Sequence, residues 1–139
     1  MRGGLIVFLL FFSILTYSQG SFKIEKVFFV DDSNWREFVD NTNLQPDYAD
    51  VEASDMERLN GILNYYQPVK RPRYKMPHEI LYGMMVSNSE NYNIRLAPNV
   101  IGVYYEDVRQ YYFISKVEDR RWLEKFIAKI KAGFKTETN

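Results

Sequence analysis

The sequence predicts one α+β domain, in which a small antiparallel sheet of about four strands packs against two to four helices and the chain ends in an amphipathic helix. Two segments carry apolar residues at three- and four-residue steps, as amphipathic helices do. Several others, mostly in the second half of the chain, alternate apolar and polar residues as strands do. Neither a repeat nor a long linker divides the sequence.

The first 18 residues have the pattern of a targeting segment. One basic residue near the amino terminus precedes an apolar run of 11 residues, Leu5–Leu15, and the small residues Thr16 and Ser18 follow. This is the layout of a secretory signal peptide, and its apolar core has about half of the ~20 residues that span a bilayer. We expect cleavage after Ser18, a folded domain over residues 19–139, and a periplasmic or extracellular location. The alternative is an uncleaved membrane anchor, for which the apolar run is short.

Composition excludes several kinds of chemistry. The chain has 18 basic and 18 acidic residues, and the targeting segment holds only Arg2 among them, so the processed chain has a net charge of −1. This balance gives no reason to expect a nucleic-acid partner. Without cysteine there is no disulfide, no cysteine nucleophile and no lipid anchor on cysteine. Small secreted eukaryotic domains often depend on disulfides, so their absence favours a bacterial export route.

The first half of the processed chain predicts one strand and two helices. A strand is expected over residues 22–30, and a short helix is expected after it, capped by residues 31–33. A longer helix is expected from Ser54, because Ser54 and Glu57 match a capping box. The strand face is expected to consist of Phe22, Ile24, Phe28 and Val30. The short helix would extend through Trp35, Phe38 and Val39, and the apolar face of the longer helix would be Met56, Leu59, Ile62, Leu63 and Tyr66.

Residues 77–86 fit two structures. Pro77 suits the first turn of a helix, which would have Ile80, Leu81, Met84 and Met85 along one side. A strand would instead place Ile80, Tyr82, Met84 and Val86 on one face. We favour the helix.

The last third of the chain predicts three strands and the final helix. Strands are expected over residues 92–97, 100–106 and 110–115, with Asp107–Arg109 as a short link between the last two. The final helix is expected over residues 116–133, with Gly133 at its C-cap. Its apolar stripe consists of Leu123, Phe126, Ile127, Ile130 and Phe134.

Adjacent tyrosines in two of these strands are the main binding candidates. Neighbours in a strand point to opposite faces. In each of the pairs Tyr104–Tyr105 and Tyr111–Tyr112, one ring can therefore enter the core while the other points outward. Outward rings on paired strands would lie side by side and form a platform for a sugar ring or a protein partner. The alternative is ordinary packing under a covering helix.

One basic segment is a second binding candidate. It consists of Lys70, Arg71, Arg73 and Tyr74, and Lys75 follows them directly. In an exported protein it would bind an acidic glycan, a lipid headgroup or an acidic protein patch. The alternative is a solvated loop whose charge is balanced by acidic residues in the segment 47–57.

Catalytic and metal sites have weak support. His78 is the only histidine, no GxSxG motif presents a serine, and neighbours on a helix point about 100° apart, so His78 and Glu79 are not a natural dyad. A carboxylate pair such as Glu79 with Asp107 remains possible, because such partners meet only in space. The acidic residues Asp47, Asp50, Glu52 and Asp55 lack the spacing of a calcium loop. We expect neither metal nor cofactor.

These observations favour a soluble exported domain of non-enzymatic type. Its expected partner is another exported protein or an envelope glycan, with no nucleic acid and no stable membrane anchor after cleavage. The first alternative is a small exported hydrolase that uses His78 or a carboxylate pair. The second is a structural module that joins an envelope complex through its final helix.

Overall fold

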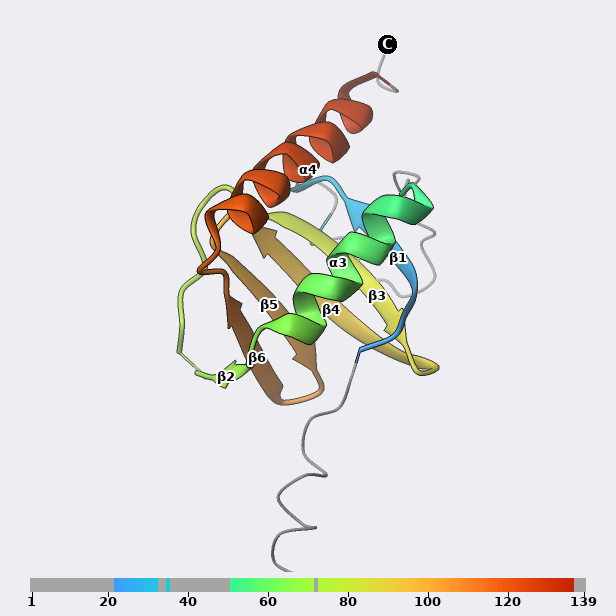
Figure 1. Ribbon diagram of the computed structural model, residues 1–139. Helices are drawn as coiled ribbons and strands as arrows, with labels where there is room; N and C mark the ends of the chain where they lie inside the picture. The colour runs from blue at the N-terminus through green and yellow to red at the C-terminus, as the bar shows by residue number, and fades with distance from the viewer. Residues whose placement is uncertain (1–21, 33–34, 36–50, 72, 137–139) are drawn as a thin grey trace, which may run out of the picture.

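The computed structural model describes residues 22–32, 35, 51–71 and 73–136 of the chain. The predicted targeting segment and Phe38 and Val39 of the expected short helix lie outside them. The elements follow in this order (Figure 1): β1 (Ile24–Val30), α3 (Ala53–Tyr65), β2 (Val69–Lys70), β3 (Leu81–Ser87), β4 (Glu90–Ala97), β5 (Val100–Tyr105), β6 (Val108–Phe113) and α4 (Val117–Thr136).

The six strands of the described residues form one antiparallel sheet with the order β1-β3-β4-β5-β6-β2. This confirms the α+β class, with more strands than the expected four. Of the two additional strands, β2 pairs only two residues with β6. A strand of two residues is too short to show an alternating pattern in the sequence, so it could not be predicted.

The other additional strand is β3, and the helix expected over residues 77–86 is wrong. β3 pairs with β1 on one side and with β4 on the other, so it is an inner strand. Leu81, Met85 and Ser87 are buried on one face, while Tyr82 and Met84 lie half-buried on the other. Pairing with strands on both sides makes this segment extended, and side chains in a strand alternate between the two faces. The two-residue alternation in the sequence is therefore the correct pattern here.

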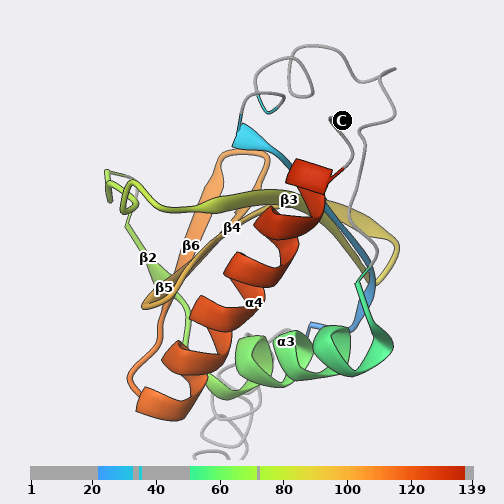
Figure 2. The same ribbon diagram turned by 90° about the horizontal axis from the view of Figure 1, so that it is seen from above.

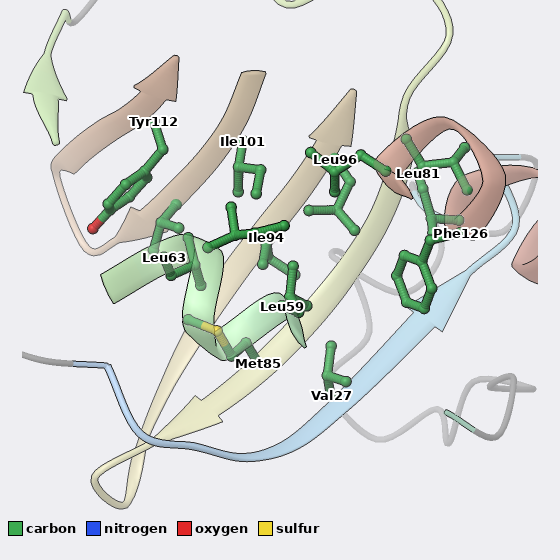
Figure 3. Packing of buried hydrophobic residues seen from close by; sticks show 14 of the residues in the cluster. Val27, Leu59, Leu63, Leu81, Met85, Ile94, Leu96, Ile101, Tyr112 and Phe126 are labelled. Atoms are coloured by element: carbon green, nitrogen blue, oxygen red, sulfur yellow. The ribbon is translucent and has the colours of Figure 1, made fainter. Parts of the chain in front are cut away.

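Both helices lie on the same face of the sheet (Figures 1 and 2). The core forms between them and that face (Figure 3). The expected apolar faces are confirmed: α3 buries Leu59, Ile62 and Leu63, and α4 buries Leu123, Phe126, Ile127 and Ile130. The opposite face of the sheet carries a smaller cluster around Ile80, Ala97, Val100 and Tyr111. No helix among the described residues is long and apolar enough to span a membrane.

A bulge in β1 changes which residues face the helices. Ile24 and Lys26 pair with two consecutive residues of β3, so Glu25 is an extra residue in the strand. Ile24 then faces the helices, while Phe28 and Val30 lie on the other face, next to the half-buried side of β3. The expected single face that joined Ile24 to Phe28 and Val30 is therefore wrong, because a bulge shifts the alternation by one residue.

Three predicted boundaries also differ from the structure. α3 has Glu52 as its N-cap without a side-chain cap, so Ser54 lies inside the helix and the capping box is not used. The turn between β5 and β6 is Glu106–Asp107, where the positive φ of Glu106 makes the reversal. Gly133 lies within α4, which continues beyond it.

A buried carboxylate joins the two helices. Asp119, in the first turn of α4, accepts a hydrogen bond from Arg58 Nη2 at 2.6 Å and one from the Tyr66 hydroxyl at 2.7 Å. The same hydroxyl accepts the backbone N–H of Lys116 at 3.1 Å. α3 and the residue after it are thus fixed to the start of α4 through the buried side chains of Asp119 and Tyr66 and the half-exposed side chain of Arg58.

Candidate functional site

The two tyrosine pairs of β5 and β6 divide between the faces of the sheet. Tyr105 and Tyr112 lie on the face that the helices cover, and Tyr104 and Tyr111 lie on the other. Tyr104 and Tyr111 contact each other, with ring centroids 5.9 Å apart and hydroxyls 3.3 Å apart. The outward ring of Tyr111 is nevertheless only 1% exposed, because Tyr74 packs on it at 4.9 Å. The exposed platform expected on this hairpin is therefore partly covered by the segment after β2.

A first hollow, which we call the aromatic hollow, lies on the helix side of the sheet where α3 ends. Its volume is about 780 Å³. Three ring contacts form its wall: Tyr92 and Tyr105 at 5.0 Å, Phe22 and Tyr92 at 5.5 Å, and Phe22 and Tyr112 at 6.1 Å. The side chains of Asn64, Gln67, Lys70, Asn88 and Gln110 also line it.

The wall of the aromatic hollow is fixed by hydrogen bonds. The backbone N–H of Phe22 donates to Asn64 Oδ1 at 2.8 Å, and Asn64 Nδ2 donates to the Phe22 carbonyl at 2.7 Å. The Tyr92 hydroxyl donates to Glu90 Oε2 at 2.9 Å. Burial and then Glu90 raise the pKa of Tyr92 to about 12, and the charge of Glu90 also raises the pKa of Tyr105. Both hydroxyls therefore stay protonated near neutral pH and offer hydrogen-bonding groups without charge.

A second hollow, which we call the basic hollow, lies over the opposite face of the sheet. Its volume is about 620 Å³. Among the described residues, the charged side chains that line it are four cations, Arg73, Lys75, Arg95 and Arg109, and one carboxylate, Asp32. Tyr74, Met76, Pro77, His78, Ile80 and Tyr82 complete the lining. The hollow is thus positive in a chain whose total charge is balanced.

Arg95 of β4 occupies the middle of this face. It pairs with Tyr82 on one side and with Gly102 on the other. Its guanidinium carbon lies 4.6 Å from the ring centroid of Tyr104, 5.4 Å from that of Tyr82 and 5.9 Å from that of Trp35, all within cation–π distance. Its Nε is buried and has no hydrogen-bond partner among the described residues.

Gly102 makes this arrangement of rings possible. A Cβ at this position would lie 2.9 Å from atoms of the Tyr104 ring, closer than a van der Waals contact. The absence of a side chain lets the Tyr104 ring lie over the sheet beside Arg95.

The predicted basic segment does not act as one unit. Lys70 lines the aromatic hollow, whereas Arg73 and Tyr74 line the basic hollow on the other face. Arg71 lies 5.2 Å from the ring centroid of Phe113. Only part of the segment therefore contributes to the positive charge around Arg95.

The catalytic candidates are not brought together. His78 and Glu79 are exposed just before β3, and Asp107 is exposed in the turn at the far end of β5. None of the three makes a hydrogen bond or ion pair with the part of the chain that the structure describes. Register places the start of β3 beside the start of β5, so Glu79 and Asp107 lie toward opposite ends of the strands.

The acidic residues considered for calcium are also used differently. Lys129 Nζ lies 2.9 Å from Asp55 Oδ2 and 3.2 Å from Glu52 Oε1, so two of the four form ion pairs with α4. Asp47 and Asp50 lie outside the described residues. Across residues 22–32, 35, 51–71 and 73–136 no group of three or more potential metal ligands occurs.

Sequence reasoning missed Arg95, Tyr82 and Tyr92. Each stands alone in a strand, and a single basic or aromatic residue in a strand usually indicates a solvated or a packed position. Only strand register could have identified them, because it places Arg95 beside Tyr82. Comparison of the chain with known protein families, curated proteins and solved structures finds no match. The candidate site is therefore defined by the geometry of the two hollows.

Proposed function

We propose that this protein is an exported, non-catalytic module that binds a glycan of the cell envelope in the aromatic hollow. The observation that carries the proposal is the contact between Tyr92 and Tyr105 in the lining of a hollow of about 780 Å³. Hollows of roughly 300–1,000 Å³ are the usual size of small-ligand sites. Two or three sugar units fit such a space.

The chemistry of the lining matches that of a sugar. The ring of Tyr105 is half-exposed, so its apolar face can pack against the C–H face of a pyranose while its hydroxyl remains in water. Sugar hydroxyls need both donors and acceptors, and the amide side chain of Gln110 offers both. Lys70 at the edge adds a cationic donor. The carboxylate Glu90 makes Tyr92 a hydrogen-bonded, rigid part of the wall.

Substitution of Tyr105 tests the proposal. Purified residues 19–139 would be titrated by calorimetry with neutral oligosaccharides built from glucose, xylose and N-acetylglucosamine. Tyr105→Ala removes the stacking face, and we expect binding of the preferred sugar to weaken by roughly tenfold, about 1.4 kcal/mol. Tyr105→Phe keeps the face, so most of the affinity should remain.

Tyr65→Ala is the matched control. Tyr65 is a tyrosine on α3 that is 60% exposed and does not line the hollow. Its loss should leave sugar binding unchanged. Equal affinity of the Tyr105→Ala and unaltered proteins would contradict the proposal. If the protein captures a protein partner and binds no sugar, protein binding becomes the favoured function in place of glycan binding.

A further inference from the structure

We propose that the basic hollow is a second binding site, separate from the aromatic hollow, and that it takes a small ligand whose carboxylate or phosphate group pairs with Arg95. The inference does not depend on the glycan proposal, because the two hollows lie on opposite faces of the sheet and share no lining residue.

The first argument is the orientation of Arg95. Rings of Tyr82, Tyr104 and Trp35 lie within 5.9 Å of its guanidinium, and Trp35 and Tyr82 stack on each other at 4.7 Å. Such neighbours restrict the side chain before any ligand arrives. A guanidinium donates its hydrogen bonds in its own plane, so cation–π contacts with rings do not use up these donors.

The second argument is an unmet hydrogen bond. The Nε–H of Arg95 is buried without an acceptor in the described part of the chain, and Arg95 makes no ion pair there. A buried donor without a partner is costly, and a charged one more so. An oxyanion with two oxygens in one plane satisfies Nε–H and a terminal N–H together in a bidentate pair.

The third argument is the charge around Arg95. Arg73 and Lys75 come from the segment after β2, Arg109 comes from β6, and Asp32 is the only carboxylate that the described residues contribute to the lining. Cations from three separate parts of the chain therefore surround one space. Like charges repel, so their convergence on a single hollow is stabilised when an anion occupies it.

The size and walls of the hollow define the ligand further. About 620 Å³ suits a molecule of one or two rings rather than a bare ion. Tyr74, Met76 and Ile80 add apolar surface to the lining. The ligand is thus an oxyanion joined to a ring or short apolar body. A guanidinium accepts carboxylate and phosphate in the same geometry, so the experiment has to separate these two sources.

Titration with three matched probes tests the inference. Benzoate and phenyl phosphate carry the two oxyanions on a ring of the same size, and benzamide is the neutral counterpart of benzoate. Binding to residues 19–139 would be followed at constant ionic strength by amide chemical shifts. We expect one or both anions to shift resonances of β4 and of residues 73–80, and benzamide to shift none. The tighter anion identifies the source of the oxyanion.

Substitutions assign the binding to Arg95. Arg95→Lys keeps the charge but loses the planar fork, and we expect a loss of affinity of roughly tenfold for the bound anion. Arg73→Ala, on an exposed segment, should weaken binding less and should leave the fold intact even if Arg95→Lys does not fold. Lys125→Ala removes an exposed cation of α4 outside both hollows, so it should have no effect.

Three results would overturn the inference. The first is equal binding of benzamide and benzoate, and the second is no binding of either anion at millimolar concentration. The third is a folded Arg95→Lys or Arg73→Ala protein with unaltered affinity. The Tyr105→Ala protein should bind the anions normally. Anion binding therefore tests the basic hollow whether or not the glycan proposal fails.

Discussion

Two glycines of the sheet make room for different kinds of neighbour. A Cβ at Gly83 of the inner strand β3 would meet the backbone carbonyl of Phe28 and the buried ring of Phe29. At Gly102, the atoms closest to a Cβ would all belong to the outer end of the half-exposed Tyr104 ring, and none to the backbone. The same substitution therefore has a different cost at the two positions.

We expect Gly83→Ala to lower the free energy of unfolding by about 1–3 kcal/mol, because the neighbouring backbone has to move. Gly102→Ala should cost roughly 1 kcal/mol or less, because the end of a side chain shifts more readily than backbone and alanine is less flexible than glycine in the unfolded chain. Urea denaturation of both variants measures the difference. Equal losses would show that the Tyr104 ring is held as firmly as the backbone beside Gly83.

Arg95 shows what a residue type alone does not reveal. Its place between Ile94 and Leu96, both fully buried, is visible in the sequence as an alternation. The alternation correctly places Arg95 on the other face of the sheet. Its three ring neighbours come from β3, β5 and the segment after β1, and long-range register of this kind is not encoded in any local pattern.

At the scale of elements, α3 and α4 could be predicted because a stripe of apolar residues at a period near 3.6 has no other simple explanation. β3 could not, because its apolar residues fit a helix with Leu81 and Met85 on one side as well as a strand with Tyr82 and Val86 on one face. The pairing of β3 with β1 on one side and with β4 on the other makes the segment a strand. No residue of β1 marks the bulge at Glu25 in the sequence. The prediction therefore placed the residues after Glu25 on the wrong face.

The polar contact between α3 and α4 gives a prediction at this scale. Asp119→Ala leaves the Tyr66 hydroxyl without its acceptor and removes the partner of Arg58, so we expect the free energy of unfolding to fall by about 2 kcal/mol. Urea denaturation measures the change. Lys129→Ala, which breaks ion pairs exposed to solvent, should have a much smaller effect. If both variants lost a similar free energy of unfolding, burial of Asp119 would not be what makes its contacts stabilising.

For the whole molecule, the protected tyrosines predict sensitivity to alkali. Burial and then Glu90 raise the pKa of Tyr92 from 10.0 to about 12, and burial also raises the pKa values of Tyr104 and Tyr112. The unfolded chain loses these protons first and binds fewer of them than the folded chain. The free energy of unfolding therefore falls as pH rises from about 10 to about 12, while the contribution is complete below pH 10.

Tyr92→Phe has no phenolic proton to lose at this position. We expect its stability to decline less steeply than that of the unaltered protein between pH values of about 10 and 12. Thermal unfolding at several pH values in this range provides the comparison, with Tyr65→Phe as a control on an exposed tyrosine. Parallel curves for Tyr92→Phe and the unaltered protein would mean that this hydroxyl titrates alike in both states.

The bulge in β1 also affects how one molecule meets another. A sheet edge with unpaired backbone groups is a template on which a strand of a second molecule can add, and such addition leads to aggregation. Here one edge is β1, which is interrupted at Glu25 and carries the exposed charges of Glu25 and Lys26. The other edge is β2, which is only two residues long. Within the described residues, neither edge is a long uncharged strand, so both are poor templates for the addition of a strand from a second molecule.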